Sequence, residues 1–156
     1  MNNTAVEAHQ SSIGNMQANV MAMLCYVSGT VLGFIPVISY VAWLAPLVIF
    51  FIEKESHFVK FHAMQAFLLN LVGVALGLLV SVVLGGIMAA SVAMATDYAS
   101  MTGALGSIAI VGVLTTIISL LILVIAIIAL IKAYKYSEYQ IPLIGGLAKK
   151  LAGKVQ

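Results

Sequence analysis

The sequence AMQAFLLNLVGVALGLLVSVVLGGIMAASVAMAT, residues Ala63–Thr96, decides the fold because it contains no charged side chain. Two more uncharged runs flank it, Ala18–Ile52 and Tyr98–Ile131. Each run exceeds the roughly 20 apolar residues that a helix needs to cross a bilayer. Apolar residues make up 63% of the chain and charged residues 8%, against roughly 45–50% and 25% in a soluble domain. The sequence therefore predicts an integral membrane protein.

The second and third runs predict a helical hairpin, with helices over residues 59–92 and 104–133. Their connection contains Asp97 and no lysine. Lysines cluster at the other end of the hairpin, where positively charged flanks mark the cytoplasmic side. These lysines are Lys54, Lys60, Lys132 and Lys135. We therefore expect the Asp97 connection to be external.

The first run is too long for one upright crossing, because 35 helical residues would extend about 52 Å. Gly33 and Pro36 interrupt it, which favours a turn. The run then forms two short helices, 14–33 and 38–52. A re-entrant pair and a single kinked, tilted helix remain alternatives. Two crossings would place the N-terminus in the cytoplasm, and one would place it outside.

The predicted fold class is all-α, a polytopic transmembrane bundle of four helices followed by an interfacial amphipathic helix. The expected segments are a flexible polar N-terminus (1–12), a transmembrane helical domain (13–135) and a cytoplasmic tail (136–156). In the tail, apolar side chains share a helical face and lysines lie elsewhere, which is typical of binding to an anionic leaflet. A disordered basic tail is the alternative.

Small residues recur at every fourth position of the third predicted helix, an arrangement that lets helices approach closely in lipid. They are Gly73, Gly77, Ser81, Gly85 and Ala89. We expect this stripe to be a packing face. The fourth helix carries its own small residues, Gly112, Thr116, Ser119, Ala126 and Ala133, which favours packing within the hairpin; a second copy of the protein is the alternative partner.

Few polar groups lie near the spans. Gln65 and Asn70 enter the third helix, where amides either hydrogen-bond neighbouring helices or line a polar cavity. No carboxylate or lysine lies within a span, which argues against proton relays and ion pathways. The spans also lack a nucleophile beside a base, so we expect neither catalytic residues nor a cofactor.

Other site chemistries fit poorly. The basic residues are all lysines, so the bidentate contacts that arginine makes with nucleic acid are missing. Cys25 is the one cysteine and is expected to pack as a small hydrophobe. His57 and His62 are five residues apart, whereas a metal-binding helical pair is four apart. A histidine that senses pH at the membrane surface remains an alternative.

Three segments together resemble a known family: AMLCYVSG at residues 22–29, FIEKESHFVKFHAMQA at 51–66, and KAY with EYQIPLIG between 132 and 145. They are similar to the Tic-twenty-like proteins, small bacterial and archaeal membrane proteins of unknown function grouped with a chloroplast protein-import component. The central segment is the most specific. Residues 85–106 look expanded relative to compact members.

This resemblance implies four membrane helices, both termini in the cytoplasm and no known catalytic residue. Plastid relatives are associated with protein import, and some bacterial relatives with magnetosome membranes. The matching residues look like a structural junction or docking edge at the membrane surface. They are Glu53, Lys54, Glu55, His57, Phe58, His62 and Gln65.

The leading hypothesis is a non-enzymatic accessory, assembly or scaffold subunit of a bacterial cytoplasmic membrane, with its C-terminus in the cytoplasm. Its expected partners are the lipid bilayer and another membrane protein or a second copy, and no nucleic acid. The alternative is a channel or carrier, formed by oligomerisation, for a small solute or a polypeptide.

Overall fold

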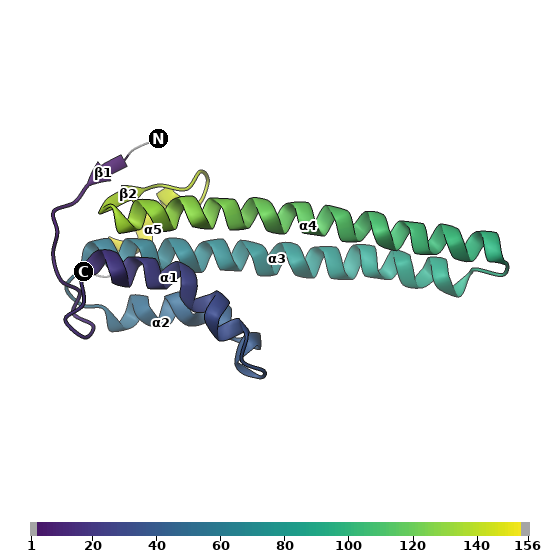
Figure 1. Ribbon diagram of the computed structural model, residues 1–156, viewed down its shortest axis with the longest axis horizontal. Coiled ribbons are helices and arrows are strands. Elements are labelled where there is room, and N and C mark those ends of the chain that lie inside the picture. The colour runs from purple at the N-terminus through teal and green to yellow at the C-terminus, as the bar shows by residue number, and fades with distance from the viewer. Residues whose placement is uncertain (1–2, 154–156) are drawn as a thin grey trace. The chain divides into compact units, whose positions relative to one another are not determined.

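The computed structural model describes residues 3–153, and most of this part of the chain is helical (Figure 1). The all-helical class is therefore confirmed, with the addition of two short strands that the sequence did not suggest. The elements in order are β1 (Asn3–Ala5), α1 (Ala18–Gly33), the 3-10 turns η1 (Ile38–Tyr40) and η2 (Ala42–Leu44), α2 (Ala45–Ile52), α3 (His57–Ala93), α4 (Tyr98–Tyr134), β2 (Ser137–Tyr139) and α5 (Gly145–Ala152).

Two helices in the described chain, α3 and α4, are long and apolar enough to cross a membrane. Each has 37 residues, which corresponds to about 55 Å at 1.5 Å per residue. Only 6% of the most apolar window of each helix is buried within the protein. The core helix of a soluble protein would bury such a window, so the outward apolar side chains of α3 and α4 suit a lipid environment. Four spanning helices remain a prediction.

The first apolar run turns where the sequence indicated. Helix α1 ends at Gly33, and η1 and η2 precede α2. Val37 has φ of 72°, a conformation that a β-branched residue rarely adopts. Short-range hydrogen bonds satisfy backbone N–H groups in this turn. For example, Ser39 N–H donates to the carbonyl of Ile35 at 2.9 Å. Phe34 and Tyr40 are more than 80% exposed, which fits a turn that meets lipid or its interface.

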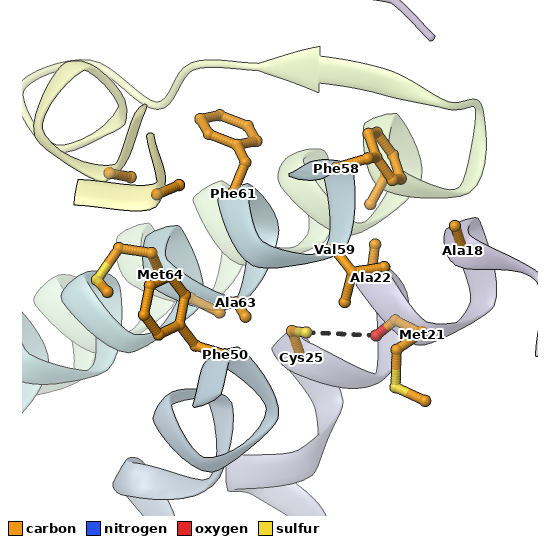
Figure 2. Packing of buried hydrophobic residues seen from close by; sticks show 14 of the residues in the cluster. Ala18, Met21, Ala22, Cys25, Phe50, Phe58, Val59, Phe61, Ala63 and Met64 are labelled. Atoms are coloured by element: carbon orange, nitrogen blue, oxygen red, sulfur yellow. Dashed lines mark hydrogen bonds between the residues drawn. The ribbon is translucent and has the colours of Figure 1, made fainter. Parts of the chain in front are cut away.

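The chain divides into two compact units. The first contains the residues up to 71 and those from 124 onward, and the second contains residues 72–123. Figure 2 shows the core of the first unit, where side chains from α1, α2 and α3 meet. Cys25, Phe50 and Val59 are each at most 2% exposed there. The Cys25 thiol donates to the carbonyl of Met21 at 3.3 Å. Cys25 thus lies inside an apolar core, and its thiol hydrogen-bonds within its own helix turn.

Helix α5 is amphipathic, as the sequence predicted, and part of its apolar face packs on the protein. Ala148 and Ala152 are fully buried in the core of the first unit, while Lys149 and Lys150 are exposed. The methyl side chains allow the helix to approach the protein closely. Part of the apolar face therefore packs on the protein, while Leu147 is 48% exposed; binding of this helix to an anionic leaflet remains a prediction.

Gly145, the first residue of α5, is required for this packing. A Cβ at Gly145 would lie 2.6 Å from Cα of Gln140, and a backbone atom cannot move aside cheaply. We expect Gly145→Ala to lower the free energy of unfolding by about 2 kcal/mol. Thermal denaturation of the purified protein measures this change. Gly146→Ala is the matched control, because a Cβ there meets nothing within 4 Å; equal effects of the two substitutions would contradict the expectation.

Candidate functional site

Residues 53–65, here called the motif junction, join α2 to α3 in the first unit. Helix α3 begins at His57 because Ser56 caps it: the Ser56 hydroxyl accepts a hydrogen bond from Val59 N–H at 3.1 Å. Ser56 is buried, and a 2.7 Å hydrogen bond joins its hydroxyl to Nε2 of His9. The helix start is therefore tied to the N-terminal segment of the chain.

Glu53 is the most heavily hydrogen-bonded side chain of the motif junction and is 1% exposed. Its Oε1 accepts bonds from Ser12 N–H and the Ser12 hydroxyl at 3.1 and 2.7 Å, and from the N–H groups of Glu55 and Ser56 at 3.1 and 3.0 Å. Its Oε2 accepts a bond from the Ser11 hydroxyl. A buried carboxylate is tolerated only when it is paired in this way.

These bonds also set the ionisation of Glu53. Burial by itself would raise its pKa. The hydrogen bonds from Ser11, from the Ser56 N–H and from Ser12 stabilise the ionised form more strongly, and they lower the pKa from 4.5 to about 2. Glu53 is therefore a charged acceptor that fixes the N-terminal segment against the motif junction, and it is not poised to exchange protons near neutral pH.

A second hydrogen-bond network lies within α3, around His62 and Gln65. Gln65 is fully buried. Its amide nitrogen donates to the Tyr26 hydroxyl at 2.9 Å and to the carbonyl of Tyr139 at 3.1 Å, and its oxygen accepts from Ile141 N–H at 3.1 Å. A 3.0 Å bond joins the same Tyr26 hydroxyl to Nδ1 of His62. Gln65 thus connects α1, α3 and the segment after α4.

Charged groups also link the segment after α4 to the motif junction. Glu138 is 7% exposed; its oxygens lie 3.4 Å from Nδ1 of His57 and 3.6 Å from Nζ of Lys149. Residue Glu138 lies in β2, which pairs antiparallel with β1. Among residues 3–153, no group of three or more His, Cys, Asp or Glu side chains could hold a metal ion.

The remaining sequence-predicted residues of the junction are placed as follows. Phe58 is buried and lies edge-on to His62, with ring centroids 4.6 Å apart. Lys54 and Glu55 are exposed. Asn70 donates to the carbonyl of Trp43 at 3.2 Å. The structure therefore brings Glu53, His57, Phe58, His62 and Gln65 into one cluster, and leaves Lys54 and Glu55 at its surface.

Sequence reasoning missed the partners of this cluster, which are Ser11, Ser12, Tyr26 and Glu138. Tyr26 and Glu138 carried a signal, since they lie in the first and the third of the three family-like segments. Nothing local distinguishes Ser11 or Ser12 from other serines near a terminus. Glu138 is also one of five acidic residues in the chain. This scarcity of carboxylates was a second signal, because a buried carboxylate needs partners.

The small-residue stripe lies in the second unit. Gly73, Gly77 and Ser81 line an open cavity of about 390 Å³ together with Thr115, Ser119 and Ile122 of α4. Cβ atoms added at Gly77 and Gly85 would meet nothing within 4 Å. Gly85 and Ala89 do not line the cavity. The role of the stripe as a packing face remains a prediction.

Comparison with known proteins identifies the family. No curated protein and no solved structure matches the chain. The sequence matches the MamF/MmsF family over residues 17–148. This match corrects the resemblance to Tic-twenty-like proteins: the three segments that suggested it lie inside the matched range, so they are residues of a different family. The chain belongs to the magnetosome magnetite crystal formation protein family, MamF/MmsF.

Proposed function

We propose that this protein is a non-enzymatic membrane component that supports magnetite crystal formation by associating with other membrane proteins through α3 and α4. The observation that carries the proposal is the family match, which covers most of the chain. The family description names no enzymatic activity. The channel or carrier alternative gains no support from this match.

The cavity beside Gly73, Gly77 and Ser81 supports association as the mode of action. In lipid, helices associate through close packing of small residues, because no hydrophobic effect drives them together. Here α4 leaves part of the stripe open. We therefore assign the open part of the stripe to a helix of another subunit, either a different membrane protein or a second copy.

The proposed topology has both termini on one side of a cytoplasmic or magnetosome membrane, with the C-terminus cytoplasmic. Pairing of β1 with β2 supports this arrangement, because it brings residues 3–5 beside residues 137–139. The run 18–52 then enters and leaves the membrane on the same side. The proposed segments remain 1–12, 13–135 and 136–156. An external signal from a reporter fused at Met1 would disprove this topology.

Gly77→Leu tests the proposal, since a Cβ at Gly77 meets nothing within 4 Å and the residue lines the open cavity. We expect a magnetite-forming bacterium that carries this variant in place of the original protein to form smaller or fewer crystals. Fewer proteins should co-purify with a tagged Gly77→Leu protein. Electron microscopy measures the crystals, and quantitative mass spectrometry measures the partners.

Leu78→Phe is the matched control, because it adds bulk next to Gly77 at a side chain that is 62% exposed. It should leave crystals and partners unchanged. Normal crystals with Gly77→Leu at a normal membrane level of the protein would disprove the association mechanism. Loss of the whole gene without any effect on crystals would disprove the proposed function itself.

A further inference from the structure

A second cavity opens at the surface of the motif junction. Its volume is about 450 Å³. Its wall combines two aromatic rings with side chains of both charges. The lining residues are Phe50, Phe51, Glu53, Lys54, Glu55, His57 and Lys60. The wall therefore offers apolar surface together with charges of both signs. Such a cavity suits an amphiphile with a zwitterionic head group.

The cavity lies where apolar surface changes to polar surface. Helix α2 ends at Ile52, and the polar stretch begins with the next residue. Val48, Phe51 and Ile52 are 54%, 68% and 54% exposed. In a membrane protein such side chains face acyl chains, while charged residues stay at the head-group level. The cavity therefore opens at the depth of phospholipid head groups.

The charges that remain for a ligand are of both signs. Both oxygens of Glu53 are occupied by hydrogen bonds within the protein, so Glu53 does not compete for a ligand. Lys54 and Glu55 are exposed on the cavity wall. A phosphate and an ammonium group could both find a partner of opposite charge here.

We propose that this cavity binds the head group of a phospholipid with a primary ammonium, such as phosphatidylethanolamine. Lys54 contacts the phosphate, Glu55 contacts the ammonium, and an acyl chain lies along Phe51. The bound lipid fixes the depth of the motif junction at the membrane surface. The inference rests on the membrane location of the chain, and it holds or fails independently of the association through α3.

Native mass spectrometry of the full-length protein tests the proposal. The detergent-purified protein is incubated with equal amounts of phosphatidylethanolamine, phosphatidylcholine and phosphatidylglycerol. We expect about tenfold more phosphatidylethanolamine than phosphatidylcholine to be retained, because a quaternary ammonium cannot donate hydrogen bonds to Glu55. Glu55→Gln should remove this preference, and Lys54→Gln should reduce retention of all three lipids.

Lys150→Gln is the matched control, since Lys150 is an exposed lysine of α5 outside the cavity. It should behave as the original protein does. Equal retention of the three lipids, stronger retention of phosphatidylglycerol, or no effect of Lys54→Gln would overturn the proposal. Displacement of the lipid by an excess of inorganic phosphate would assign the site to free phosphate and overturn it as well. Circular dichroism confirms that each variant is folded.

Discussion

Glu53→Gln is expected to lower the free energy of unfolding by about 3 kcal/mol, because hydrogen bonds to a charged acceptor contribute about 1.5–3 kcal/mol each and several are weakened together. The amide keeps the size of the side chain but replaces one acceptor oxygen by a donor, which then faces the hydroxyl and N–H donors around Glu53. We also expect faster hydrogen exchange in residues 9–17, which Ser11 and Ser12 hold against the motif junction. Thermal denaturation and hydrogen–deuterium exchange measure the two effects.

Acid should produce the same release in the unsubstituted protein. The folded-state pKa of Glu53 is about 2, below its ordinary 4.5. The stabilisation, about 3 kcal/mol, is therefore fully present above about pH 4.5 and is lost as the pH falls toward 2. Stability measured between pH 6 and pH 2 should fall less steeply in Glu53→Gln than in the unsubstituted protein.

Glu55→Gln is the control for both effects, since Glu55 is an exposed carboxylate two residues away. It should change the stability by less than about 0.5 kcal/mol. If Glu53→Gln and Glu55→Gln exchanged hydrogen equally fast in residues 9–17, Glu53 would not be the group that holds the N-terminal segment.

Gln65→Leu is expected to be comparably destabilising, by about 3 kcal/mol. Leucine fills a similar volume but leaves the N–H of Ile141 and the carbonyl of Tyr139 without their partner, and each unsatisfied buried group costs about 1–3 kcal/mol. The chain after α4 should detach, so that trypsin cleaves after Lys149 and Lys150 sooner. Timed proteolysis followed by mass spectrometry measures this release.

Asn70→Leu provides the comparison for Gln65. Its amide nitrogen donates to the carbonyl of Trp43 at 3.2 Å, in the segment between α1 and α2 rather than in the C-terminal segment. We expect a smaller loss of stability and no change in cleavage at the tail lysines. Equal proteolysis of both variants would show that Gln65 does not anchor the tail.

The hydrogen-bond networks of Glu53 and Gln65 both hold other segments of the chain against the motif junction. Glu53 binds residues 11 and 12, while Gln65 binds residues 139 and 141. Both ends of the chain are thus fastened to one short motif. The buried part of the motif junction therefore holds segments from both ends of the chain against the start of α3.

The sequence by itself determined the membrane class, the two long helices and the position of the motif at the start of the first of them. These features depend on local composition, because uncharged runs partition into lipid and clustered charges stay at its surface. The turn near Gly33 and the amphipathic character of α5 were also predictable, since glycine, proline and helical periodicity act within a few residues.

Only the tertiary structure decided which groups meet. Glu53 and Ser11 are 42 positions apart, and Gln65 and Ile141 are 76 apart. No periodicity links such positions, so their hydrogen bonds exist only once helices from both ends of the chain are packed together. Ala148 and Ala152 of α5 likewise pack in the core of the first unit, because the shape of the packed core, which sequence pattern does not encode, decides their neighbours.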